Sequence, residues 1–185
     1  MKTFPLYLAL LALPLLTLAA PPHLPSVHLE VKNIGSSKKT DHEWESGYGS
    51  YWRTFTRNLH LVAEVGTLDK DASQIELGYY FFGKRLSDGQ RVLVKCGSMT
   101  VDLKSKQGNQ TIDLQSGDTK ARVENYAALN EKYAEGLKFE GWMVRATFGD
   151  DNVVLDAKAS SPSLLAIARD AKEIERLYTA YSDNQ

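Results

Sequence analysis

The residue types best suited to binding gather in one short stretch, residues 41–52. Its sequence, Asp-His-Glu-Trp-Glu-Ser-Gly-Tyr-Gly-Ser-Tyr-Trp, sets four large aromatic rings among glycines, serines and acids. These rings are Trp44, Tyr48, Tyr51 and Trp52. Aromatic faces stack on sugars or anchor protein partners, and nearby carboxylates accept hydrogen bonds from hydroxyl groups. The stretch has neither helical nor strand periodicity, so we expect a long loop that binds a protein or a glycan partner.

The same four rings have a second, structural explanation. Large aromatic side chains commonly fold back and cover one end of a β-fold, where no partner reaches them. The exposure of Trp44 and Trp52 separates the two explanations, because a binding surface needs rings that face the solvent.

Known catalytic spacings are absent from the sequence. The chain has no G-x-S-x-G, no H-E-x-x-H, no C-x-x-C and no phosphate-binding glycine loop. His42 alone among the histidines has carboxylate neighbours, Asp41 and Glu43, and adjacent residues of an extended chain point to opposite sides. We therefore expect no catalytic residue, no metal and no cofactor. The alternative is a small secreted hydrolase in which two carboxylates face each other across a cleft.

Three further features have simple structural explanations. The turn at residues 149–152 offers oxygen ligands but lacks the alternating carboxylates and distal glutamate of a calcium loop. Cys96 is the single cysteine and continues the apolar series Val92, Val94, so it predicts a small buried side chain rather than a reactive thiol. Residues 109–111 match a glycosylation sequon.

The N-terminus has the pattern of a targeting segment. Lys2 precedes an apolar run over residues 4–18, and small residues at Thr17 and Ala19 suit a signal peptidase. We expect a signal peptide over residues 1–20, cleavage near Ala19 or Ala20, and a secreted or periplasmic protein. No later apolar stretch approaches the roughly 20 residues of a membrane span. A formal net charge of −1 at pH 7 gives no basic footprint for nucleic acid.

The elements that must position these residues are mostly strands. Alternation predicts a hairpin of strands 137–148 and 153–159 around the turn at 149–152. Its first strand changes phase between Phe139 and Trp142. Either a β-bulge near Glu140 and Gly141 restores one apolar face, or the strand is covered on both faces.

The hairpin is followed by an amphipathic pattern. Ser160 or Ser161 can cap a helix whose first turn accepts Pro162, and apolar residues recur at three- and four-residue spacing as far as Tyr181. We expect one helix over residues 162–181, packed on the sheet.

Upstream, alternation predicts further short strands, with a central one at 75–82, loops at 35–41 and 41–52, and a short helix or ordered loop at 125–136. The sequence therefore predicts a single domain, residues 21–185, built as an antiparallel two-sheet β-sandwich of immunoglobulin-like or jelly-roll-like layout. The predicted function is an exported, non-catalytic module that binds a protein or glycan, or a subunit of an envelope assembly.

Overall fold

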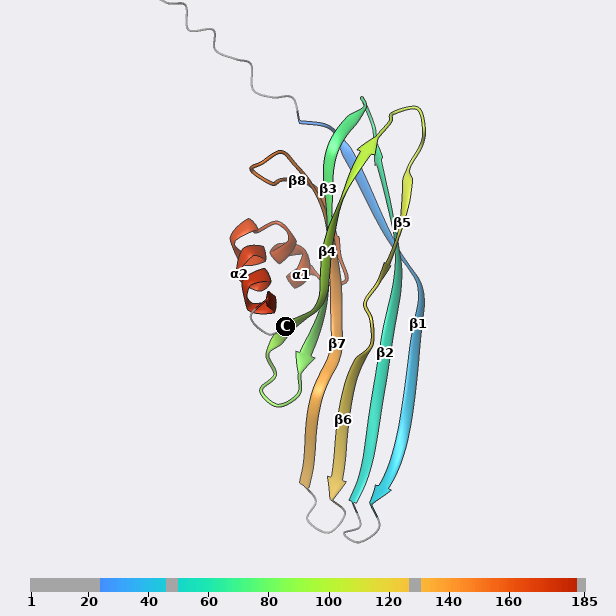
Figure 1. The fold of residues 1–185 in the computed structure, drawn as a ribbon, viewed down its shortest axis with the longest axis vertical. Helices are drawn as coiled ribbons and strands as arrows, with labels where there is room; N and C mark the ends of the chain where they lie inside the picture. Colours follow the sequence, from blue (N-terminus) through green and yellow to red (C-terminus); the bar gives the residue numbers. More distant parts are fainter. Residues whose placement is uncertain (1–23, 46–49, 127–130, 183–185) are drawn as a thin grey trace, which may run out of the picture.

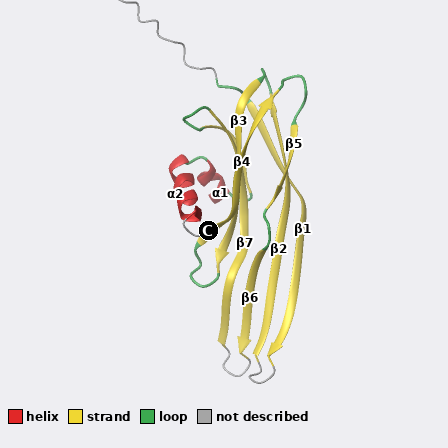
Figure 2. Cartoon of the chain, in the orientation of Figure 1, coloured by secondary structure: helices red, strands yellow, loops and turns green. Residues whose placement is uncertain are grey.

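The computed structural model describes residues 24–45, 50–126 and 131–182. Within them, eight strands form one antiparallel sheet and two short helices follow (Figures 1 and 2). The strands are β1 (Val27–Glu45), β2 (Ser50–Thr67), β3 (Ala72–Arg85), β4 (Arg91–Leu103), β5 (Gln110–Gln115), β6 (Thr119–Tyr126), β7 (Glu131–Phe148) and β8 (Val153–Ala159). The helices are α1 (Pro162–Ala168) and α2 (Ala171–Ser182). A mostly β, antiparallel fold with a C-terminal helical segment is thus confirmed.

Strand β7 joins the two parts of the sheet. The order is β1-β2-β6-β7-β3-β4, with β5 paired to β2 and β8 paired to β7. β7 pairs first with β6, up to Gly136, and from Leu137 onward with β3. At this change Gly136 has a positive φ of 86°, and a Cβ there would collide with the carbonyl oxygen of Lys120. The pairing gives one open sheet, so it does not establish the two-sheet sandwich that the sequence predicts.

The first hydrophobic core brings distant strands of this sheet together. It joins buried residues of β1, β2 and β5, such as Leu29, Leu61 and Leu114, to residues of β3, β4 and β7, such as Ile75 and Val144. Both faces of β3 are covered, because Phe81 lies in this core whereas Phe82 lies in a second one. The predicted central strand at 75–82 is therefore confirmed.

The second core lies between the sheet and the two helices. Leu164 and Ala168 of α1 and Ile174 and Leu177 of α2 pack against β3, β4, β7 and β8, notably on Met143. Figure 1 shows both helices on the same side of these strands. The amphipathic segment covers its own sheet, as its periodicity predicts.

The single helix predicted over residues 162–181 is wrong in one respect, because the segment breaks at Arg169 and Asp170. Ser161 caps α1 by accepting a hydrogen bond from Leu164 N. Asp170 then accepts hydrogen bonds from Lys172 N at 3.0 Å and Glu173 N at 3.2 Å. A side chain that caps a new helix at this point stops the first one, and local spacing does not reveal it.

The bulge predicted in β7 is confirmed. Phe82 of β3 pairs with Gly141, and the next residue, Gly83, pairs with Phe139, so Glu140 is the extra residue. Phe139 and Trp142 consequently pack against the same core. The turn after β7 is also confirmed, since Gly149 and Asn152 both adopt positive φ angles.

Three predicted irregular segments are strands instead. Residues 35–41 belong to β1, residues 41–45 and 50–52 extend the β1–β2 hairpin, and residues 131–136 begin β7. Residues 46–49 and 127–130 lie outside the described chain. In each case the backbone hydrogen bonds to a neighbouring strand outweigh a local composition of glycine, serine and charged residues. β1 accommodates one irregularity by a register shift between Asn33 and Gly35.

Candidate functional site

The far end of the β1–β2 hairpin carries a cluster of exposed rings. Trp44 and Tyr51 are directly opposite each other across the two strands. Their ring centroids are 4.9 Å apart with the planes tilted by 50°. Trp44 is 77% exposed, the highest value among the large hydrophobic residues of the described chain. Most of the Trp44 side chain therefore faces the solvent, where a partner can reach it.

Two polar side chains hold Tyr51 in place. The imidazole of His42 stacks on the Tyr51 ring at 5.4 Å, and its Nδ1 shares a hydrogen bond with the Tyr51 hydroxyl. The guanidinium of Arg53 lies 5.2 Å from the centroid of the same ring. We call His42, Trp44, Tyr51 and Arg53 the aromatic patch. It presents two rings, a cation and a histidine from paired strands, which fixes their spacing.

The opposite face of the same strands carries a second group. The guanidinium of Arg122 lies 3.7 Å from the ring centroid of Trp52, and Tyr133 meets that ring edge-on at 6.4 Å. Arg122 also forms ion pairs with Glu43 at 3.7 Å and Glu135 at 3.8 Å. Trp52 is half-buried by these neighbours, so its ring faces are already in contact with the protein.

The four residues predicted as one binding loop are thus divided. Trp44 and Tyr51 come together, Trp52 lies on the other face, and Tyr48 lies outside the described residues. The cause is the alternation of a β-strand, which turns residues 51 and 52 to opposite sides. The sequence analysis did not identify Arg53, which belongs to the aromatic patch, or Arg122, which contacts Trp52 on the opposite face. Once these residues are placed on strands, the two-residue spacing of Tyr51 and Arg53 signals a shared face.

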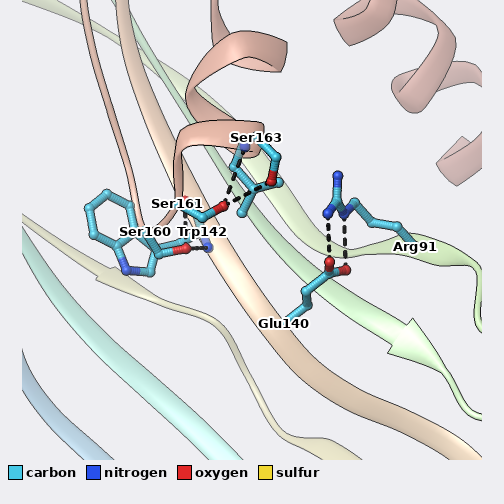
Figure 3. Close-up of polar contacts among 7 residues, drawn as sticks. Arg91, Glu140, Trp142, Ser160, Ser161 and Ser163 are labelled. Carbon is cyan, nitrogen blue, oxygen red and sulfur yellow. Dashed lines mark hydrogen bonds and ion pairs between the residues drawn. The ribbon is translucent and has the colours of Figure 1, made fainter.

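A pocket of about 740 Å³ lies where α2 meets β4 and β7. Arg91 is among its lining residues and forms two hydrogen bonds to Glu140, from Nε at 3.0 Å and from Nη2 at 2.6 Å (Figure 3). The hydrogen bond from Arg91 holds the pKa of the Glu140 carboxyl below its usual range. A general acid needs the opposite shift, so this pair favours a structural role.

Cys96 does not belong to the buried series that the sequence suggests. A register shift between Phe81 and Phe82 places Leu93, rather than Val94, in the second core. Cys96 is half-buried against that core, and burial raises the pKa of its thiol. A hydrogen bond with Tyr178 partly opposes this shift. The neutral thiol is therefore favoured, which makes Cys96 a poor nucleophile.

Other candidate ligands stay apart in space. In the part of the chain that the structure describes, no three His, Cys, Asp or Glu side chains are grouped as they would be around a metal ion. His60 pairs with Asp113 at 3.2 Å on the exposed face of β2 and β5. Over the same residues, neither helix has the length and apolar character needed to cross a bilayer.

Comparisons with known proteins do not place the chain in a family. No protein-family model matches the sequence, and curated proteins give no significant match. Among solved structures, one from Akkermansia muciniphila aligns over 73% of this chain and 71% of its own, with 8% identity and a TM-score of 0.28. A Northeast Structural Genomics Consortium target aligns over 62% of this chain and 84% of its own, with 12% identity and a TM-score of 0.18.

Proposed function

We propose that this chain is an exported, non-catalytic β-sandwich module that binds a protein partner through the aromatic patch, as a free binding protein or as a subunit of an envelope assembly. The proposal rests on the exposure of Trp44, whose side chain is 77% exposed. Its ring contacts the ring of Tyr51, which His42 and Arg53 hold in place. The export follows from the N-terminal pattern of residues 1–20.

The composition of the patch favours a protein over a glycan. Tryptophan, tyrosine and arginine are the residues that most often dominate the binding energy of protein interfaces. A sugar platform needs an open aromatic face, and the Tyr51 ring is stacked by His42 and approached by Arg53. Only Trp44 keeps such a face, and a single ring gives a weak site for a sugar.

The test is affinity capture with the purified mature protein from an envelope or culture extract of its host. We expect one partner to be retained by the wild-type protein and lost by Trp44→Ala/Tyr51→Ala. Trp52→Ala is a control for the opposite face of the same strands. Leu68→Ala is a control for an exposed apolar residue elsewhere, since Leu68 is 70% exposed.

Capture by both control variants, with folding confirmed by circular dichroism, assigns the loss to the aromatic patch. Equal capture by the double variant and the wild-type protein would contradict the proposal. Capture that is abolished by soluble oligosaccharide would point to a glycan instead.

A further inference from the structure

A second pocket, of about 450 Å³, lies on the face of the sheet that also carries the aromatic patch. The strands β1, β2, β6 and β7 continue past the turn between β3 and β4, so among the described residues no strand of β3 or β4 lies beside this part of the sheet (Figure 1). Leu86, in that turn, lines the pocket. The volume falls in the range of roughly 300–1,000 Å³ that small-molecule sites occupy.

The floor of the pocket is apolar. Alternation along β2 and β6 turns Phe55, Ala121 and Val123 to this face, and β7 adds further apolar residues. The floor residues are Phe55, Ala121, Val123, Ala134, Leu137 and Phe139. Two large rings stand beside small side chains, which leaves a hollow between them. Such a floor suits an alkyl chain or another slender apolar group.

The rim of the pocket is basic. Lys38, Arg57 and Lys138 are among its lining residues, and none of the pocket's lining residues is an aspartate or glutamate. Lys38 and Arg57 are direct cross-strand partners between β1 and β2. Like charges in this position destabilise a sheet unless a counter-charge lies near them. In the described residues neither side chain forms an ion pair, although Arg57 lies 5.0 Å from the centroid of the Phe139 ring.

We propose that this pocket binds a monomeric amphipathic anion, a molecule with an apolar chain and a carboxylate head of the fatty-acid class. The chain occupies the apolar floor, and the head accepts charge-assisted hydrogen bonds from Arg57 and Lys38. The bound carboxylate relieves the repulsion between these two cations. The basic rim favours an anion over a neutral molecule. The apolar floor favours an anion with an alkyl chain over one without such a chain. This site does not depend on the protein partner proposed above.

Isothermal titration of the full mature protein tests the site with three probes. Decanoate, kept below its micellar concentration, supplies both the head and the tail, decanol lacks the charge, and acetate lacks the tail. We expect decanoate to bind with one-to-one stoichiometry, and decanol and acetate to bind at least about tenfold more weakly. Equal affinities for decanol and decanoate would show that the basic rim does not contribute to binding and would overturn the proposal of an anion site.

Variants locate the binding. Arg57→Gln and Lys38→Gln are expected to weaken decanoate binding about tenfold and about threefold, respectively. Ala134→Phe fills the floor and is expected to abolish binding. Lys39→Gln is the matched control, because Lys39 is the next residue of β1, points to the other face and pairs with Asp41 at 3.0 Å.

A result in which Lys39→Gln weakens binding as much as Lys38→Gln would overturn the proposal. Unchanged affinity in Arg57→Gln would do so as well, and we expect this variant to fold because Arg57 is an exposed residue. Affinity capture through Trp44 is measured separately, so failure of either proposal is recognised independently of the other.

Discussion

At the scale of single residues, the pair formed by Arg91 and Glu140 links the bulge of β7 to strand β4, which lies on the other side of β3 in the sheet. Both side chains are about one-third exposed, at 33% and 28%, and two hydrogen bonds join them. The pKa of Glu140 is lowered chiefly by its hydrogen bond from Arg91. The carboxylate therefore stabilises the fold above its ordinary pKa of about 4.3, and this stabilisation is lost as the pH falls through the lower pKa of the folded state.

We expect Glu140→Gln to reduce the free energy of unfolding at pH 7 by up to about 1 kcal/mol, since the pair is partly exposed to solvent. The difference from the wild-type protein should shrink as the pH falls below the ordinary carboxyl pKa of about 4.3 and through the lower pKa that Glu140 has in the folded state. Urea unfolding at pH 7 and pH 3 measures both quantities. Glu175→Gln removes the same charge from an exposed position and is the control. A difference between Glu140→Gln and wild type that stays constant with pH would contradict this explanation.

The residues of the candidate site show how far composition alone leads. Trp44 and Tyr51, singled out by their type and their polar neighbours, lie in contact, with Trp44 exposed and Tyr51 half-buried. Trp52 lies on the opposite face, which composition does not show, because the face depends on residues 50–52 forming a strand. Arg122 and Tyr133, about 70 to 80 positions further along the chain, meet Trp52 only through the pairing of β2 with β6 and of β6 with β7. No local pattern contains that information.

At the scale of elements, the bulge of β7 lets helix α1 approach the sheet. Gly141 follows the bulge, and a Cβ at this position would collide with Ser160 Oγ and lie 2.7 Å from Leu164 Cδ1. Ser160 is fixed there by three hydrogen bonds with the backbone of Trp142 (Figure 3). Its Oγ accepts one from Trp142 N at 3.0 Å, and Trp142 O accepts the other two, from Ser160 N at 2.9 Å and from Ser160 Oγ at 3.3 Å. The close approach of α1 therefore requires a residue without a side chain.

We expect Gly141→Ala to lower the free energy of unfolding by about 1–3 kcal/mol, the usual effect of inserting a methyl group into a packed contact. Gly35→Ala is the matched control, because no atom lies within 4 Å of a Cβ built there and its φ is negative. Urea unfolding of both variants at neutral pH compares them. Equal stability of the two variants would show that α1 can move away from β7 without loss.

Elements with regular alternation of apolar and polar residues could be predicted from the sequence. Strand pairings between segments without such alternation could not. The bulge, the turn at 149–152 and the central strand β3 each have a local signal of glycine, turn formers or apolar residues on both faces. The extension of β1 through residues 35–41 has none, because Ser36, Ser37, Lys38 and Lys39 look like a loop. Their strand conformation comes from pairing with residues 56–59 of β2. The break between α1 and α2 depends on Asp170 acting as a cap rather than as a surface charge.

At the scale of the whole molecule, the two parts of the sheet differ in how much they are buried. β3 and the second half of β7 are covered on both faces, by the first core and by the helices. β1 is an edge strand, and its residues 32–40 are exposed. Stability in such a molecule is not uniform, since opening the edge exposes little apolar surface.

We therefore expect amide hydrogen exchange to be slowest in residues 75–82 and 142–147 and much faster in residues 36–43. Hydrogen–deuterium exchange with mass spectrometry on peptides from these segments measures the difference. Peptides from residues 59–65 of β2, whose inward side chains lie in the first core, should fall on the slow side. Exchange in residues 36–43 as slow as in 75–82 would mean that the extended hairpin is as stable as the core.

The continuity of β7 has a mechanical consequence. Its first residues bond to β6, which bonds to β2, and its later residues are anchored between β3 and β8. Backbone hydrogen bonds in an antiparallel sheet run across the strands. A force applied at Trp44 along the strand direction would therefore load many of these hydrogen bonds in shear at the same time. It would not break them one after another from one end of the strand. We therefore expect such a load to pass along the hairpin into the part of the sheet that the two hydrophobic cores bury.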